Sequence, residues 1–414
     1  MTTSAPPGLH AATPGARPAE TSREGAAPRP ELVVDTPLPE FGAHGYLVVD
    51  RRVQGSAWGG LRIAPDATLE DMLRSARVMT LKYGWLGIPS GGAKAALRLP
   101  EDRAASRAAA LRALGRAWRE PLQSGAWHPG LDMGCTVEDR DQLLLGAGMR
   151  RRGGRDTSGR YTAGSVYCAV RAALRRRGRT PAGHTFAVQG FGRVGSEFAR
   201  LMEAAGARLV AASTRAGAAW NPRGLAVAEL LARRARRGDE FIRELPGGAP
   251  LDPQALLELE VDVLVPAAGC GVLHAGNRGR VRAAVVACAA NAPMDADTER
   301  ALTARGVIVV PDFVANCGGI LGTTVEPYLD GRRISRLLDQ EYRPRVEQLL
   351  EAAAAAGATL TELAAAQAEA RLAAFEVRGR SGAFRAGRRL LRALPRVLRA
   401  PLAYPYCARS LFRS

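Results

Sequence analysis

Two lysines carry the strongest chemical signal in this sequence. The chain has 58 lysines and arginines among its 414 residues, but only Lys82 and Lys94 are lysines. Arginine stays protonated in proteins, whereas a desolvated lysine can lose its proton near neutral pH. Because the chain uses arginine for nearly all of its positive surface charge, we predict that both lysines serve chemistry rather than solvation.

Asp132 is the candidate proton carrier. It lies in the segment His128-Pro129-Gly130-Leu131-Asp132-Met133-Gly134, which we interpret as a loop between apolar helices. A carboxylate can exchange protons with a reacting group, although many loop aspartates only cap a helix. A catalytic role is conceivable for the nearby thiol of Cys135, but a small packing residue is the interpretation that we favour.

A glycine-rich segment indicates dinucleotide binding. The sequence Gly190-Phe191-Gly192-Arg193-Val194-Gly195 fits G-x-G-x-x-G, follows an apolar strand at 185–188 and begins a helix expected at 195–205. Gly190 allows a tight turn, Gly192 lets the backbone approach a pyrophosphate, and Gly195 lets helix and strand pack closely. Glycines also mark plain turns, but here the strand, loop, helix and second strand all agree.

The second strand of this unit, expected at 208–212, bears on the choice between NAD and NADP. It ends in Ser213-Thr214-Arg215 and lacks the carboxylate that would bind a ribose 2′-hydroxyl. Thr214 and Arg215 are suited to a 2′-phosphate, which favours NADP. A solvent-facing arginine in an arginine-rich chain explains the pattern equally well, so the cofactor is predicted as NAD or NADP.

The remaining patterns predict an α/β protein of two domains. In the first part we expect a strand at 46–50, helices at 69–83 and 104–122, and a turn at 88–93. After a polar hinge at 151–160 we expect a helix at 161–177 and further strands at 261–265, 283–287 and 307–310. Alternating strands and helices indicate a parallel sheet covered on both faces, a Rossmann-type dinucleotide-binding domain.

These patterns divide the chain into five parts. We expect a disordered leader over 1–30, a substrate-binding and oligomerisation domain over 31–150, and the dinucleotide-binding domain over 151–335. Alanine-rich helices within 336–377 would return to complete the first domain, and a basic tail would occupy 378–414. Scattered cysteines without a CxxC pair predict a reduced, cytoplasmic setting and no metal site.

The net charge of +18 is concentrated in the tail. Ten arginines and no acidic residue fall within 378–414, so the remainder carries only +8. Without a basic surface interleaved with aromatic residues, we predict no nucleic-acid partner. Leu390, Leu391, Leu394, Val397 and Leu398 would form an apolar stripe typical of a membrane-surface helix, ended by Pro401 and Pro405. A poorly ordered extension is the alternative that we slightly favour.

At these residues the sequence resembles the glutamate/leucine/phenylalanine/valine dehydrogenase family. The resemblance extends from about Gly45 to Glu326. The matching segments, in family order, are Gly59-Gly60-Leu61-Arg62, residues 79–94, Pro129 to Gly134, residues 188–195, Val265-Pro266-Ala267-Ala268, Ala290-Asn291-Ala292-Pro293, and Pro311-Asp312 through Ala315-Asn316-Cys317-Gly318-Gly319.

The resemblance implies NAD(P)-dependent oxidative deamination of an L-amino acid by a homo-oligomer. It implies that Lys82 holds the substrate α-carboxylate, that Lys94 is a general base of low pKa which activates water, and that Asp132 moves protons to and from the amino nitrogen. It places Trp58, Gly60 and Thr323 on the substrate side of the site. The cofactor side would comprise the glycine loop (190–195) together with Thr162, Thr214, Arg215, Ala268, Asn291 and Asn316.

Departures from the family pattern bear on the substrate. Glutamate dehydrogenases carry a lysine where this chain has Trp58, so an apolar or unusual side chain is predicted rather than glutamate. The family's asparagine in the glycine loop is replaced by Arg193, and a family glutamate by Cys288. These replacements keep a second class open, a catalytically silent paralogue that binds nucleotide as a regulatory or scaffold subunit.

Overall fold

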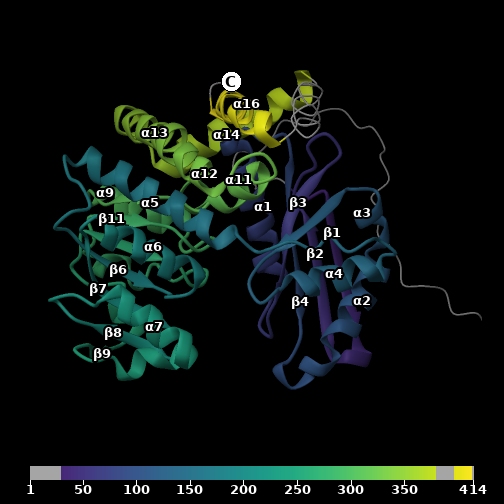
Figure 1. Ribbon diagram of the computed structural model, residues 1–414, viewed down its shortest axis with the longest axis horizontal. Helices are drawn as coiled ribbons and strands as arrows, with labels where there is room; N and C mark the ends of the chain where they lie inside the picture. Colours follow the sequence, from purple (N-terminus) through teal and green to yellow (C-terminus); the bar gives the residue numbers. More distant parts are fainter. Residues whose placement is uncertain (1–28, 379–395, 413–414) are drawn as a thin grey trace, which may run out of the picture.

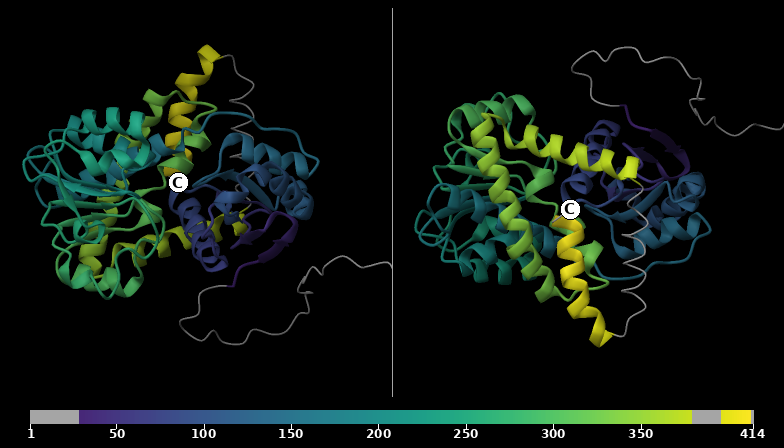
Figure 2. Two further views of the ribbon diagram at one scale, coloured as in Figure 1. Left: turned by 90° about the horizontal axis from the view of Figure 1, so that it is seen from below. Right: turned by 90° about the horizontal axis from the view of Figure 1, so that it is seen from above.

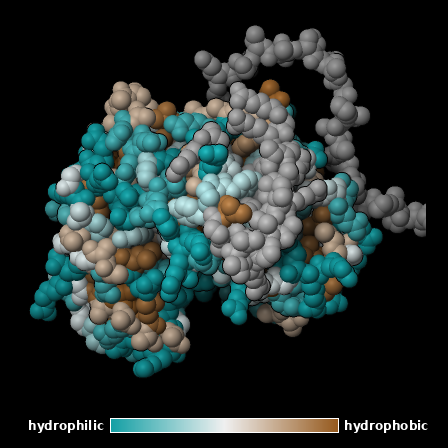
Figure 3. Space-filling model, turned by 45° about the horizontal axis from the view of Figure 1, so that its top comes forward, coloured by the Kyte–Doolittle hydropathy of each residue, from teal (hydrophilic) through white to brown (hydrophobic). Residues whose placement is uncertain are grey.

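The computed structural model describes residues 29–378 and 396–412 of the chain. Almost all of the leader, together with positions 379–395 and 413–414, lies outside the described residues. Two halves, each built around one sheet, lie side by side, and the C-terminal helices run across both of them (Figure 1). The surface is mostly hydrophilic on the face shown in Figure 3, where a notch separates the two halves.

The first half contains a five-stranded mixed sheet in the order β1-β2-β4-β3-β5. β1 and β2 are antiparallel, as are β2 and β4, whereas β3 runs parallel to both β4 and β5. The strands are β1 (Leu32–Leu38), β2 (Ala43–Val49), β3 (Ala57–Ile63), β4 (Gly91–Arg98) and β5 (Trp127–Leu131). The helices of this half are α1 (Leu69–Leu86), α2 (Arg107–Ala117), α3 (Arg119–Gln123) and α4 (Val137–Gly146), and two 3₁₀ turns are η1 (Pro39–Phe41) and η2 (Glu101–Ser106).

Helix α1 packs unusually close to β4. Thr68 caps its N-terminus by accepting a hydrogen bond from the backbone N–H of Asp71, and Gly87 ends it in the left-handed conformation. A Cβ atom on Gly92 would lie only 2.1 Å from the backbone nitrogen of Thr80. Gly92 therefore permits this packing. The turn predicted over 88–93 ends earlier, because Gly91 and Gly92 already belong to β4.

Two other local predictions in this half were wrong. The single helix expected over 104–122 is divided into η2, α2 and α3, with Trp118 leaving helical geometry between the last two. Pro121 cannot supply an N–H in a helix interior and lies instead within the first turn of α3. Asp132 directly follows strand β5 rather than lying between two helices.

The second half contains a seven-stranded sheet in the order β12-β11-β10-β6-β7-β8-β9. The first five strands in that order are parallel, and β8 and β9 form an antiparallel edge. The strand order reverses between β6 and β10, and ligands of such sheets bind at this switch point. The strands are β6 (Thr185–Gln189), β7 (Arg208–Thr214), β8 (Gly217–Trp220), β9 (Ala249–Leu251), β10 (Val263–Pro266), β11 (Val285–Ala287) and β12 (Ile308–Val310).

Alternate strand residues of this sheet face two separate apolar cores. Phe186, Val188 and their neighbours pack against helices α5 and α6, whereas Ala187, Leu264 and Val286 pack with residues of α8 and α9. Both faces are therefore covered, as predicted for a parallel sheet. The helices are α5 (Ser158–Arg176), α6 (Arg193–Ala204), α7 (Val227–Arg237), α8 (Pro253–Leu256) and α9 (Ala296–Ala304), with 3₁₀ turns η3 (Gly238–Glu244) and η4 (Arg278–Arg280).

The helices after β12 connect the two halves. They are α10 (Asp312–Ala315), α11 (Gly318–Val325), α12 (Gly331–Leu337), a π-helical turn η5 (Leu338–Tyr342), α13 (Arg343–Ala356) and α14 (Leu360–Arg378). Helix α14 returns to α1, where a Cβ on Gly84 would lie 2.5 Å from the carbonyl oxygen of Ala368. Arg51 ties the same helix down by bonding to both Glu369 and Glu376.

The described part of the tail is a helix, α16 (Arg396–Phe412), which runs through Pro401 and Pro405 rather than ending at them. Ala403, Cys407, Ala408 and Leu411 are buried in the core shared with α1 and α5, so the extension that we favoured is folded onto the protein here. Leu390, Leu391 and Leu394 lie outside the described residues, as do the side chains of Val397 and Leu398.

Among the described helices, none is by itself long and apolar enough to span a membrane. Residues 331–356 and 360–377 meet that length and composition only as a pair bent by 115°.

The close packing of α1 on β4 gives a stability prediction. Replacing Gly92→Ala should lower the free energy of unfolding by about 3 kcal/mol, because the new methyl group must push the Thr80 backbone away. Gly279→Ala is the matched control, since its Cβ would have no neighbour within 4 Å, and its effect should stay within about 0.5 kcal/mol. Urea unfolding of the two variants measures the difference, and equal stabilities would contradict this account of the packing.

Candidate active site

Strand register gathers the candidate residues on one face of the first sheet. Trp58 pairs with Gly92 of β4 and with His128 of β5, and Gly60 pairs with Gly130. Side chains alternate along a strand, so these residues share a face with Lys94. The opposite face, with Leu61, Ala93 and Ala95, is packed into the apolar core under α2 and α4.

Asp132 lies between two cations at the end of this face. Its Oδ2 atom is 2.9 Å from Nζ of Lys94 and 3.1 Å from Nε of Arg62. The Lys94 side chain is 2% exposed and that of Arg62 is 10% exposed. Burial alone would raise the pKa of Asp132, but Lys94 and Arg62 hold it well below its usual value. The structure therefore places an ionised carboxylate against the lysine.

Lys82 reaches across to the second half. It lies in the last two turns of α1, and its Nζ atom donates to Oδ1 of Asn291 over 2.7 Å. Burial lowers its pKa from 10.5 to about 8, opposed by the negative charge of Asp312. A desolvated ammonium group of this kind binds a carboxylate strongly.

Two asparagines and an aspartate organise the facing wall. Asn316 Nδ2 donates to Oδ1 of Asn291 over 3.1 Å and to the carbonyl oxygen of Ala289 over 3.1 Å. Asp312 Oδ2 accepts the backbone N–H of Ala292, which holds that residue at a left-handed φ of 45°. Burial raises the pKa of Asp312, although Lys82 opposes the shift. The hydrogen bond from Asn316 thus holds the Asn291 side chain in place as the acceptor for Lys82.

The glycine loop has the geometry that its sequence predicts. Gly190 has a φ of 96°, and a Cβ there would lie 2.5 Å from the Cβ of Ala268. A Cβ on Gly195 would lie 2.1 Å from the carbonyl oxygen of Gly190, whereas one on Gly192 would meet nothing within 4 Å. The backbone around Gly192 is thus open to a ligand at the N-terminus of α6.

Two buried acceptors in the same region lack partners. Oδ1 of Asn316 and Oε1 of Gln189, the residue before Gly190, make no hydrogen bond within the described part of the chain. An unsatisfied buried acceptor is costly, and the amide N–H₂ of a nicotinamide is a donor that suits one. The open loop and the unpaired acceptors therefore fit a nicotinamide dinucleotide.

The end of β7 differs from the simplest sequence expectation. The Thr214 hydroxyl donates to the backbone carbonyl of Asp239 over 2.9 Å. Nε of Arg215 donates to the side-chain carboxylate of Asp239 over 3.2 Å. The acid missing from the strand is thus supplied by η3. Arg215 is 91% exposed, so its position alone does not show a phosphate site.

Comparison with known proteins agrees with this geometry. The model for "Glutamate/Leucine/Phenylalanine/Valine dehydrogenase" matches residues 153–379, and that for "Glu/Leu/Phe/Val dehydrogenase, dimerisation domain" matches residues 37–137. The chain belongs to this dehydrogenase family. The resemblance inferred from the motifs is therefore confirmed, as is the two-domain α/β fold.

Individual relatives of this dehydrogenase-family chain cover most of its length. Glutamate dehydrogenase of Thermotoga maritima is 31% identical over 355 residues, which are 79% of this chain and 83% of the relative. The NADP(+)-dependent glutamate dehydrogenase of Pyrobaculum calidifontis is also 31% identical, over 78% of this chain and 82% of its own. The hetero-hexameric glutamate dehydrogenase of Thermus thermophilus (Leu-bound form) has a TM-score of 0.72 and 25% identity, over 83% of this chain and 88% of its own.

Other predicted site residues have different local environments. Thr162 lies against α11, where a Cβ on Gly319 would approach its hydroxyl to 2.6 Å, and the exposed Thr323 donates to the Gly319 carbonyl oxygen. Arg193 begins α6 and pairs with Asp156. The buried Cys288 belongs to the core formed with α8 and α9.

The surroundings of Trp58 include two residues that the sequence did not identify as part of the site. His128 stacks on its ring at 4.5 Å between centroids, and the guanidinium carbon of Arg152 lies 5.0 Å from the ring centroid. Arg152 donates to the Pro129 carbonyl, while its backbone N–H is held by buried Asp141. Burial lowers the pKa of Arg152. It forms no ion pair with any carboxylate that the structure describes.

Arg62 was also missed as a functional residue, although it belongs to a quoted motif. Replacing Arg62→Met should lower the free energy of unfolding by about 3 kcal/mol, because Asp132 then keeps only one cation. Arg74→Met removes an exposed pair with Asp71 on α1 and should cost less than about 1 kcal/mol.

The same variant has a pH signature. The lowered pKa of Asp132 adds stability above its usual value of 3.8, and this stability is lost as the pH falls. Without Arg62 the loss between about pH 5 and pH 2 should be smaller. Unfolding measured across that range, with the same slope for wild type and Arg62→Met, would show that Arg62 does not hold Asp132 ionised.

Proposed function

We propose that this chain is an NAD(P)-dependent L-amino-acid dehydrogenase that oxidatively deaminates its substrate to a 2-oxo acid and ammonia. The observation that carries the proposal is the convergence of both lysines and Asp132 at the seam between the halves. The motif resemblance assigns a catalytic or binding role to each of these residues, which supports the proposal. The chain's membership in the family supports the same class of reaction.

Lys82 is the proposed anchor for the substrate. Its buried ammonium group would pair with the substrate α-carboxylate. In this structure the ammonium group donates a hydrogen bond to Oδ1 of Asn291, beside which the carboxylate would bind. Asp132 would accept a proton from the substrate ammonium group, and a bound nicotinamide would accept the hydride from Cα. Lys94 would then act as the general base that takes a proton from the water attacking the imino carbon. Asp132 would return its proton to the nitrogen of the resulting carbinolamine so that ammonia can leave, and the Asp132 carboxylate or solvent would then take the hydroxyl proton as the 2-oxo acid forms.

Either nicotinamide cofactor fits the proposed site. The loop from Gly190 to Gly195 would hold the pyrophosphate, and Asn291 and Asn316 would face the nicotinamide. At the ribose, Arg215 favours a 2′-phosphate, whereas the Asp239 carboxylate favours a 2′-hydroxyl. NAD and NADP are therefore tested together.

The substrate side chain is proposed to contact Trp58. The indole ring supports an apolar or aromatic side chain rather than glutamate, as predicted from the loss of the family's lysine. One observation favours a different class of substrate, with an acidic side chain. Arg152, close to this ring, has no carboxylate partner among the described residues. A substrate with an acidic side chain would supply that partner.

Assembly is proposed to follow the family pattern. The match of residues 37–137 to a dimerisation-domain model supports a homo-oligomer formed through the first domain. We propose a cytoplasmic location, which the absence of a single spanning helix among the described residues permits.

Reduction of NAD⁺ and NADP⁺ with a panel of L-amino acids tests the proposed function. The panel should include leucine, phenylalanine, tryptophan and glutamate. Lys94→Ala should lower kcat/KM by about 10²- to 10⁴-fold, because the general base is lost. Arg98→Ala, at the exposed end of the same strand, is the matched control and should retain full activity.

The panel also separates the alternatives. Turnover of glutamate that is lost in Arg152→Gln would favour the acidic class over the apolar one. Cofactor binding without turnover of any panel member would contradict the dehydrogenase proposal and favour a silent nucleotide-binding paralogue.

A further inference from the structure

Helix α16 occupies a seat between the two halves that the family match does not include. The family model ends at residue 379, and α16 spans Arg396–Phe412. The helix lies along the boundary between the halves in the right view of Figure 2. Its neighbours are the end of α1, helix α11 with the loop after it, α12, η5 and α13. An added segment of this chain therefore contacts elements of both halves.

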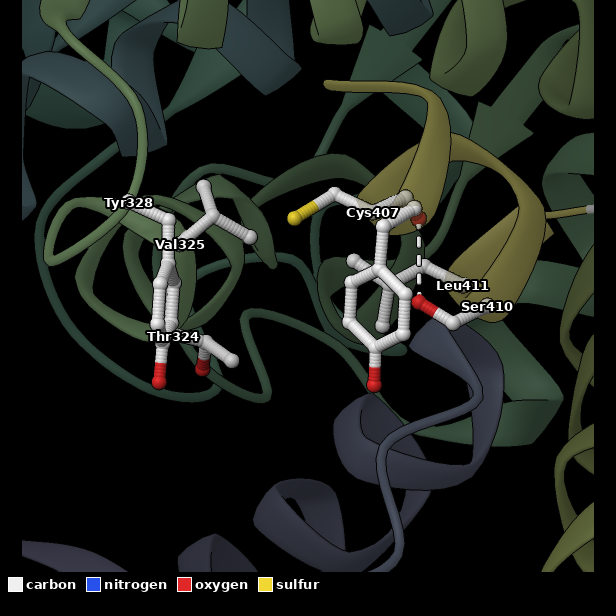
Figure 4. Close-up of a pocket in the computed structure, with 7 residues that line it drawn as sticks. Thr324, Val325, Tyr328, Cys407, Ser410 and Leu411 are labelled. Carbon is white, nitrogen blue, oxygen red and sulfur yellow. Dashed lines mark hydrogen bonds between the residues drawn. The ribbon is translucent and has the colours of Figure 1, made fainter. Parts of the chain in front are cut away.

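One side of the seat is formed by α11 and the loop that follows it. Thr324, Val325 and Tyr328 face Cys407 and Leu411 across a narrow gap (Figure 4). The Cys407 side chain points toward this gap and is 4% exposed. Thr324 directly follows Thr323, a residue proposed for the substrate pocket. Docking of α16 thus supports the back of that helix.

The other side of the seat is the end of α1. A Cβ on Gly87 would lie 3.1 Å from the carbonyl oxygen of Leu411, so the two backbones are close. Trp85, one helical turn beyond Lys82, is fully buried in the same core as Leu411. Movement of α1 relative to α11 would therefore disturb both the Lys82–Asn291 bond and the seat of α16.

Arg345 of α13 lies between these two sides. Its guanidinium carbon is 4.2 Å from the Trp85 ring centroid and 5.9 Å from that of Phe412. Nη1 donates to the Leu411 carbonyl oxygen over 3.3 Å, whereas Nε and Nη2 have no acceptor in the described structure. Docking of α16 contributes one hydrogen bond and one ring, but leaves this buried charge incompletely satisfied.

Two features make the docked helix marginal. An interior proline costs a helix about 3 kcal/mol, and α16 contains Pro401 and Pro405. The unpaired nitrogens of Arg345 would regain water if the helix left. Burial of Ala403, Cys407, Ala408 and Leu411 opposes these costs. Because these contributions oppose each other, a change in the seat alters how firmly α16 docks.

We propose that α16 is an intramolecular strap. Its reversible docking favours the closed arrangement of the two halves, the one in which Lys82 contacts Asn291. When α16 leaves its seat, one of the contacts that hold α1 beside α11 is lost, and the Lys82–Asn291 contact opens more readily. The proposal goes beyond the dehydrogenase function. It rests on that function only where it takes closure of the two halves to aid the reaction.

Thiol labelling and small-angle scattering test the strap without using turnover. Ala408→Arg places a long side chain in the buried face of α16, whereas Arg409→Ala changes the neighbouring exposed residue. Ala408→Arg should raise the labelling rate of Cys407, assigned by peptide mapping, by about tenfold or more, equivalent to about 1.4 kcal/mol of weaker docking. It should also increase the radius of gyration, while Arg409→Ala should match the wild type in both.

Phe412→Ala provides a milder second variant if Ala408→Arg does not fold. It removes one ring beside Arg345 and should accelerate labelling in the same direction. Faster Cys407 labelling without any change in scattering would overturn the proposal, because α16 would then only cover the core. Unchanged labelling in both folded variants would also overturn it. Neither result depends on whether Lys94 supports turnover.

Discussion

The structure depends on desolvated positive charge at the seam between its halves. Lys82, Lys94 and Arg62 are all buried there, and Asp132 is the one carboxylate bonded directly to two of them. Taking such charges out of water is costly unless they are paired. A substrate carboxylate would add a direct ionic partner for Lys82, whose ammonium group bonds the Asn291 amide oxygen and is stabilised by the nearby negative charge of Asp312. This excess of positive charge would favour the binding of an amino acid carboxylate.

The rest of the fold positions Lys82, Lys94, Arg62 and Asp132 relative to one another. Gly60 and Gly130 have no side chains, so the sheet face between Trp58 and Asp132 is not covered there. Gly92 lets α1 approach closely enough to place Lys82 opposite Lys94. The second sheet contributes Asn291 from the carboxyl end of its strands, near the switch point. The reacting groups are thus held by the core of the first sheet and by the larger core that α1 shares with the second sheet.

Much of this arrangement could be predicted from local sequence. The glycine loop, the five parallel strands of the second sheet and the pair of lysines each have a short-range signature, so the fold class and the importance of the lysines could be predicted. The antiparallel edge strands β8 and β9 were not predicted. Strand β4 was not predicted, and its first residues were assigned to a turn, because Gly91 and Gly92 resemble a turn when the helix packed on them is unknown. Arg62, Arg152 and Asp239 were missed as site residues, because their partners are distant in sequence. The folding of α16 also depends on distant contacts, and its prolines predicted an end instead.

The two lysines allow an unusually direct test of the central claim, that both ammonium groups are buried for substrate chemistry. Selective ¹⁵N labelling of lysine would give only two side-chain signals, which Lys82→Met and Lys94→Met would assign. The Lys82 signal should titrate near pH 8, and its pKa should rise when a 2-oxo acid binds, because the ligand carboxylate stabilises the ammonium. Titration of Lys82 near its usual value of 10.5, with no response to 2-oxo acids or amino acids, would contradict the account.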